Sequence, residues 1–245
     1  MGFIVHQPRP KHLSDPFHDF SDSSLVELLA TPDEQLNWSH FNQLLGPFLP
    51  AGTYEESVYF LPLAFDYLLT HLDDALEFQD AVVGFASKYA PQLKADGYLS
   101  SVQAQFLACL DTWTNTFTIT HFDEAACRTN GWGLAYFDYV GASTEVCQML
   151  CDLVRFEVHT TLAEGFLITL ANKLQDPLTA CWFLEIARAN QADDVYKPPD
   201  SLLIQKLLKS PELQRQAALT INTHCRSTKP SPTYWPDMFV LLSLT

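Results

Sequence analysis

The chain has 245 residues, of which 47% are hydrophobic and 18% charged, so it carries enough apolar side chains for a sizeable core and is not a disordered polymer. Its 29 acidic and 14 basic residues give a formal charge of −15, which argues against a general nucleic-acid binder. No apolar segment approaches the length of a membrane span, so we expect no membrane partner.

The N-terminal sequence lacks the apolar stretch and small-residue cleavage site of a secretory signal peptide, so the expected compartment is the cytoplasm. The cysteines form an even set: Cys109, Cys127, Cys147, Cys151, Cys181 and Cys225. Without a secretion signal, free buried thiols are favoured over disulfides. The sequence leaves the oligomeric state open.

Most of the excess negative charge lies in the first third of the chain. No Lys or Arg occurs from His12 to Ser87, and the same segment holds 13 acidic residues. A concentrated field of one sign opposes folding, but it also steers a basic partner toward the surface. The alternative is a solvated acidic face that binds nothing.

The first predicted elements are an irregular arm and two helices. Residues 1–20 contain three prolines and are expected to form the arm. Ser21 or Asp22 can cap a short helix. Thr31-Pro32-Asp33-Glu34 combines an N-cap, a first-turn Pro and an acidic residue, which predicts a helix that runs to about Leu45.

Further helix signals continue along the chain. Thr53-Tyr54-Glu55-Glu56 predicts a capping box, and Pro62 predicts a kink or a restart in the helix that follows. Other helical patterns cover residues 72–89, 98–115, 142–158, 160–173, 178–191, 201–209 and 211–225. Helix-rich spacing with short Pro-marked connections is typical of an all-helical protein.

We therefore predict an all-α fold, either a multi-helix bundle or an irregular α-solenoid, with at most a minor strand near 116–120. The predicted domains are an irregular N-terminal arm (1–20), a main helical domain (21–197) and a C-terminal helical hairpin (198–245) packed on the same domain. Pro198-Pro199 is the strongest linker signal between the last two.

One string has the form of an enzyme motif. Asp73-Asp74-x-x-Glu77 resembles the aspartate-rich motif of helical prenyl-transferring and terpene-forming enzymes, in which paired carboxylates hold Mg²⁺ against a diphosphate. Neither a second metal-binding motif nor a basic diphosphate clamp accompanies it. We predict no catalytic residue, no bound metal and no cofactor. A small helical Mg-dependent enzyme that uses Asp73, Asp74 and Glu77 stays open as an alternative.

The acidic residues also suggest a binding surface. Asp66, Asp73, Glu77 and Asp80 are spaced by 7, 4 and 3 residues, so on one continuous helix they would share a face. The candidate contacts for a basic partner are Glu55, Glu56, Asp66, Asp73, Asp74, Glu77 and Asp80. A second candidate patch combines aromatic and acidic side chains, as binding hot spots do, and comprises Trp132, Tyr136 and Asp138.

A resemblance in two short segments adds to this pattern. The segments Gly46-Pro47-Phe48-Leu49-Pro50 and Tyr59-Phe60-Leu61-Pro62 resemble helical bacterial families in which a Tyr-Phe-Leu-Pro string opens the second helix. With its acidity and compact length, the chain is similar to immunity proteins of bacterial polymorphic toxin systems. The resemblance implies a stoichiometric inhibitor that covers a basic toxin active site, and it assigns no functional residue.

The sequence thus favours a non-enzymatic acidic protein-binding module, an immunity-type inhibitor that occludes a basic, toxin- or nuclease-like partner. Besides the metal enzyme, a structural adaptor is a further alternative. Its contact surface would be the C-terminal hairpin around Lys206, Lys209 and Arg215.

Overall fold

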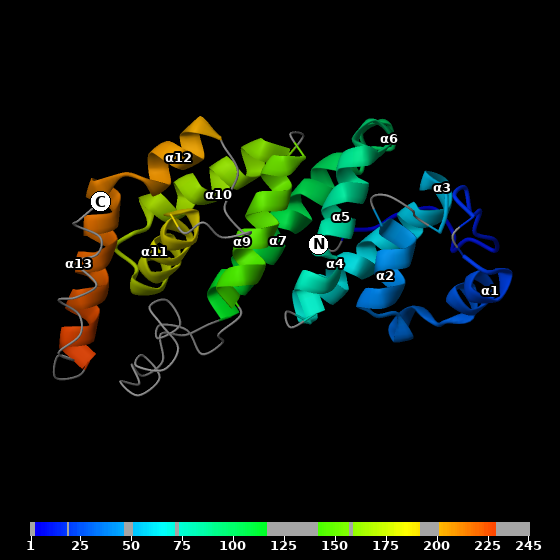
Figure 1. Cartoon of the computed structure of the whole chain (residues 1–245), viewed down its shortest axis with the longest axis horizontal. Coiled ribbons are helices and arrows are strands. Elements are labelled where there is room, and N and C mark those ends of the chain that lie inside the picture. Colours follow the sequence, from blue (N-terminus) through cyan, green and yellow to red (C-terminus); the bar gives the residue numbers. More distant parts are fainter. Residues whose placement is uncertain are drawn as a thin grey trace. The chain divides into compact units, whose positions relative to one another are not determined.

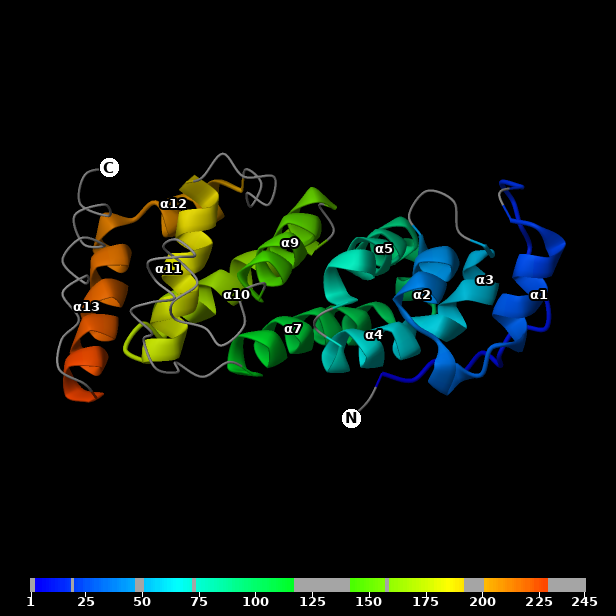
Figure 2. The same cartoon turned by 60° about the horizontal axis from the view of Figure 1, so that its bottom comes forward.

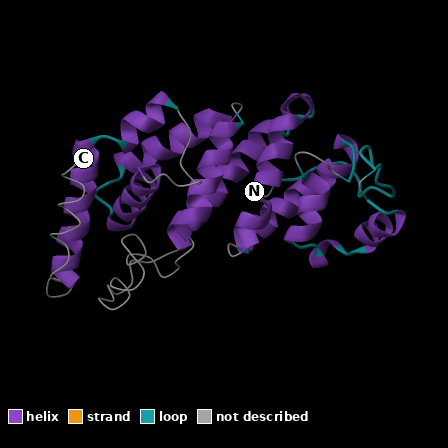
Figure 3. Cartoon of the chain, viewed as in Figure 1, coloured by secondary structure: helices purple, strands orange, loops and turns teal. Residues whose placement is uncertain are grey.

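A computed structural model describes residues 3–18, 20–46, 51–71, 74–116, 142–156, 159–191 and 201–228. Within these ranges all regular structure is helical and no strand occurs, so the predicted all-α class is confirmed (Figure 3). Of the predicted strand near 116–120, only Thr116 is described, and it is the last residue of a helix. The remainder of that prediction lies outside the described residues.

The chain divides into two compact units: Met1–Leu110 with Arg155–His159, and Asp111–Val154 with Thr160–Thr245. In chain order the helical elements are α1 (Asp22–Ala30), η1 (Asp33–Gln35), α2 (Trp38–Leu45), α3 (Tyr54–Ser57), η2 (Val58–Phe60), α4 (Leu61–Thr70), α5 (Ala75–Lys88), α6 (Ala90–Ala95), α7 (Leu99–Thr116), α9 (Ala142–Arg155), α10 (Thr160–Asn172), α11 (Pro177–Gln191), α12 (Leu202–Leu208) and α13 (Pro211–Thr228) (Figure 1). The predicted limits of the arm, main domain and hairpin stay predictions.

The prediction for the start of the second helix is wrong. The Thr31 hydroxyl donates to the Glu27 carbonyl at 2.9 Å and so closes α1 instead of capping the next helix. The α-helix begins only at Trp38, because Asn37 is its N-cap and forms a capping box with His40. Between these points the chain makes a single 3₁₀ turn.

The next two helix signals are confirmed. Thr53 and Glu56 form the predicted capping box at the start of α3. The chain then passes through the 3₁₀ turn η2 into α4, whose first turn contains Pro62. The predicted restart at this proline is therefore present, because a first-turn proline has no N–H that the helix would need.

Aromatic side chains fill the core of the first unit, where α2, α4 and α5 pack against one another (Figures 1 and 2). The rings of Phe41 and Phe78 stack with centroids 5.7 Å apart, and Phe65 meets Phe106 edge-on at 5.0 Å. Burial of such a side chain stabilises the fold by about 1.5–3 kcal/mol. The Asn42 side chain also donates to the Glu77 carbonyl, which ties α2 to α5.

In the second unit, α13 packs along α11, and α10 and α12 pack against α11 as well. The side chain of Trp182 is fully buried and its indole N–H donates to the Thr114 carbonyl at 2.9 Å.

The prediction of free buried thiols is confirmed where the structure describes the cysteines. Four of them are buried thiols that form no disulfide: Cys109, Cys147, Cys151 and Cys181. Burial raises the pKa of the Cys109 thiol to about 12, so this thiol stays protonated near neutral pH. The side chains of Cys127 and Cys225 lie outside the described residues.

Candidate partner-binding surface

Four of the predicted contact residues are exposed carboxylates of the first unit. Glu55 lies on α3, Asp66 on α4, and Glu77 and Asp80 on α5. In the part of the chain that the structure describes, no ion pair joins any of these four to a base. Their charges are therefore open to cations of another molecule.

The single helix that would align the acidic stripe is not formed. α4 ends at Thr70, and His71 leaves the helical conformation with φ −129° and ψ 68°. α5 begins only at Ala75. Asp66 therefore lies on a different helix from Glu77 and Asp80 and does not share a face with them. Of the predicted stripe, the described residues that share a helix face are Glu77 and Asp80, three residues apart in α5.

Asp74 is used inside the fold. It is half-buried, and its carboxylate accepts a hydrogen bond from the Tyr67 hydroxyl. Burial of the ring, together with this bond to an anion, raises the pKa of Tyr67 to about 12. The phenol thus stays a hydrogen-bond donor over the whole neutral range.

Two further tyrosines donate hydrogen bonds to carboxylates in the same way, and neither pair was predicted from the sequence. The Tyr54 hydroxyl donates to Asp96 at 2.7 Å, and the Tyr59 hydroxyl donates to Asp33 at 2.5 Å. Burial followed by the bond to Asp96 raises the pKa of Tyr54, whereas for Tyr59 the bond to Asp33 is the main cause of the raised pKa. Each tyrosine lies far from its acid in the sequence, 42 and 26 positions respectively, so no local sequence pattern predicts these hydrogen bonds.

Glu56 anchors the N-terminal arm instead of facing solvent. Its carboxylate accepts bonds from the Ser14 N–H and hydroxyl, both at 2.8 Å, and from the Thr53 N–H at 3.0 Å. Nδ1 of His12 lies 3.7 Å from Oε1 of Glu56. Burial raises the pKa of Glu56, but these donors favour the anion more strongly and leave its pKa below the ordinary value.

We expect Glu56→Gln to lower the free energy of unfolding by about 1–2 kcal/mol at pH 7, because charge-assisted hydrogen bonds become neutral ones. The folded-state pKa of Glu56 is depressed, so its contribution is complete above the unfolded-state pKa and is lost as the pH falls through the folded one. Urea unfolding of the wild type and of Glu56→Gln at pH 7 and at pH 3 measures the difference in unfolding free energy and its loss in acid. Glu55→Gln, at the exposed neighbour, is the matched control and should behave like the wild type.

The other predicted contacts, Asp73, Trp132, Tyr136 and Asp138, lie outside the described residues. The metal alternative includes Asp73 and stays a hypothesis. Elsewhere, among the described side chains, no group of three or more His, Cys, Asp or Glu could hold a metal ion. The basic residues of the adaptor alternative are all exposed: Lys206, Lys209 and Arg215.

No helix in the described ranges is long and apolar enough to span a membrane. Comparisons with protein families, with curated proteins and with solved structures found no match to this chain. The role of the chain is therefore inferred from its own residues, and the resemblance to immunity proteins stays a hypothesis.

Proposed function

We propose that this chain is a non-enzymatic, acidic protein-binding module that acts as an immunity-type inhibitor by covering a basic surface of its partner. The observation that carries the proposal is the set of exposed carboxylates without described ion pairs: Glu55, Asp66, Glu77 and Asp80. A toxin nuclease with a cationic phosphate-binding cleft is the kind of partner that this charge suits.

The charge balance supports this proposal. Residues 1–110 contain 4 bases and 14 acids, a net charge of 4 − 14 = −10, whereas residues 111–245 contain 10 and 15, a net of −5. Of the few bases in the first part, Arg9 pairs with Asp33, and the Lys88 ammonium lies over the Tyr89 ring with 5.1 Å to its centroid. Cations from a partner would relieve the repulsion that remains, so the same charges that oppose folding favour binding.

Reversing two charges on the shared face of α5 tests the proposal. We expect the double variant Glu77→Lys, Asp80→Lys to bind the partner at least about tenfold more weakly, equivalent to about 1.4 kcal/mol. The partner is first captured from an extract of the source organism at low salt and identified by mass spectrometry. Its affinity for wild-type and variant chains is then measured by calorimetry at about 0.1 M and about 1 M salt, where screening lengths are about 10 and 3 Å.

The control is Glu212→Lys, which reverses an exposed acid on α13 in the second unit. It should leave the affinity unchanged, and all variants must retain wild-type circular dichroism. Equal binding by the double variant and the wild type would refute the proposal. Loss of binding only on reversal of Lys206 and Lys209 would instead identify the adaptor. Binding of Mg²⁺ that Asp73→Asn abolishes would identify the metal enzyme.

A further inference from the structure

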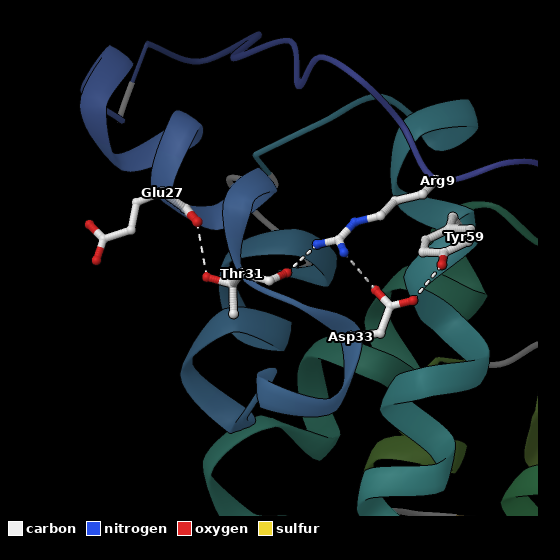
Figure 4. A network of polar contacts seen from close by, with 5 residues as sticks. All are labelled: Arg9, Glu27, Thr31, Asp33 and Tyr59. Atoms are coloured by element: carbon white, nitrogen blue, oxygen red, sulfur yellow. Dashed lines mark hydrogen bonds and ion pairs between the residues drawn. The ribbon is translucent and has the colours of Figure 1, made fainter.

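The chain builds a receptor for one guanidinium group in its first unit (Figure 4). Nη1 of Arg9 lies 3.1 Å from Oδ1 of Asp33, and Nη2 donates to the Thr31 carbonyl. The guanidinium carbon lies 5.8 Å from the centroid of the Phe60 ring. A carboxylate, a carbonyl and an aromatic face together are what a planar arginine head recognises, and a lysine ammonium would not satisfy all three.

Neighbouring groups hold these acceptors in position. The Tyr59 hydroxyl donates to the second oxygen of Asp33, which orients the carboxylate toward Arg9. The Thr31 hydroxyl donates to the Glu27 carbonyl, which fixes the end of α1 where the Thr31 carbonyl is presented. The receptor is thus built from residues outside the arm, with Arg9 as its occupant.

The occupant belongs to an extended segment laid across helices, seen as the dark-blue trace beside α4 in Figure 2. Leu13 is buried with 2% of its surface exposed, and Phe3 meets the ring of Phe65 edge-on at 6.3 Å. The backbone N–H of His6 donates to the Tyr98 hydroxyl at 3.1 Å. Arg9 and Lys11 are the only Lys or Arg residues before Lys88, so the arm is an intramolecular basic ligand of an acidic unit.

The fit of this ligand is incomplete. Nε of Arg9 is buried and has no hydrogen-bond partner in the described part of the chain, so one donor of the guanidinium is desolvated there without compensation. The ion pair keeps partial solvent access, with 28% of the Arg9 side chain and 31% of the Asp33 side chain exposed. An arginine whose guanidinium could also use its Nε–H in a hydrogen bond would bind the same carboxylate and carbonyl with a smaller desolvation penalty.

We propose that the site of Thr31, Asp33, Tyr59 and Phe60 recognises an arginine in an extended segment of the basic partner, and that the chain's own arm fills it as a displaceable strap. The strap shields the site in the free protein, and the partner's arginine replaces Arg9 when the complex forms. That the partner is basic rests on the proposed function. That the recognised residue is an arginine follows from the contacts that Asp33, Thr31 and Phe60 make with Arg9.

The test uses the full chain and a synthetic peptide of residues 3–14 that carries Lys11→Gln. Trypsin reports on the arm, because proline after Arg9 blocks cleavage there and leaves the Lys11–His12 bond as the reporter. We expect excess peptide to accelerate cleavage of the wild-type chain after Lys11 at least about tenfold, since proteolysis follows the population of the open form. The same peptide with Arg9→Gln should have no effect.

Two chain variants complete the test. Asp33→Asn should be cleaved after Lys11 rapidly without any peptide, whereas Glu34→Gln, at the exposed neighbour, should behave like the wild type. Should Asp33→Asn unfold, as judged by circular dichroism, Arg9→Gln gives the same comparison with the receptor intact. Equal effects of both peptides, or none, would overturn the inference. Because no foreign partner is used, a positive peptide result with no basic partner captured would count against the proposed function alone.

Discussion

Replacement of His159 by leucine is expected to raise the free energy of unfolding by roughly 1–3 kcal/mol at pH 7, because the change removes buried polar groups that are not hydrogen-bonded. The His159 side chain is fully buried, and neither ring nitrogen has a hydrogen-bond partner among the residues that the structure describes. Its ring lies against Phe106, with ring centroids 5.3 Å apart. Leucine has a similar volume and needs no polar partner. Urea unfolding followed by circular dichroism measures the difference.

The same residue predicts how stability depends on pH. Burial lowers the pKa of His159 to about 4, below the value of about 6.5 for an unfolded chain. Between these two values the unfolded chain binds a proton that the folded chain does not. Stability therefore falls as the pH drops from about 6.5 to about 4, by roughly 3 kcal/mol in all, and this contribution changes no further below that range.

His159→Leu should lack this part of the acid destabilisation, so the stability gap between variant and wild type should widen from pH 7 to pH 4.5. His6→Leu, at an exposed position of the arm, controls for the loss of a histidine as such. A gap that stays constant over this pH range would show that the folded protein tolerates a charged imidazole at position 159.

The second large effect is expected at Trp182. Trp182→Ala should lower the free energy of unfolding by about 3–5 kcal/mol, because it leaves a cavity the size of an indole in a fully packed site. Trp182→Phe should cost about 1–3 kcal/mol, since it keeps a ring but removes the donor to the Thr114 carbonyl. Urea unfolding followed by circular dichroism gives both values.

Trp38→Phe is the matched control, because Trp38 is only half-buried at the start of α2. Its cost should be below about 1 kcal/mol, in keeping with a partly exposed site. Similar losses for Trp38→Phe and Trp182→Phe would contradict the importance assigned to burial and to the bond from Trp182. If Trp182→Ala unfolded at the same urea concentration as the wild type, the tight packing of Trp182 in α11 would be contradicted.

Local signals predicted most helices, because the bonds that start a helix join residues within one turn. The Ser21 side chain accepts from the backbone N–H of Ser24, as a cap should, and Thr53 and Glu56 close their box without help from distant residues. Pro177 and Pro211 both stand at the first position of their helices, as expected from the missing N–H of proline.

The start of α2 shows where local signals compete. Thr31 and Asn37 are both good N-caps by residue type, and the sequence prediction placed the start of this helix at Thr31. The folded chain starts the helix at Asn37 instead: Leu36 is buried with 4% of its surface exposed, and the Thr31 carbonyl accepts a hydrogen bond from Arg9. A contact across 22 positions cannot be read from a window of one or two helical turns.

By itself the sequence determined that the chain is helical, acidic and almost without cations in its first third. These properties follow from residue counts and from bonds between near neighbours. Only the tertiary structure decided which acids remain exposed: Glu77 and Asp80 face solvent, while Glu56 holds the arm and Asp74 accepts from a tyrosine. The physical reason is that a carboxylate's exposure depends on which distant donors the folded chain brings to it, and net charge contains no information about them.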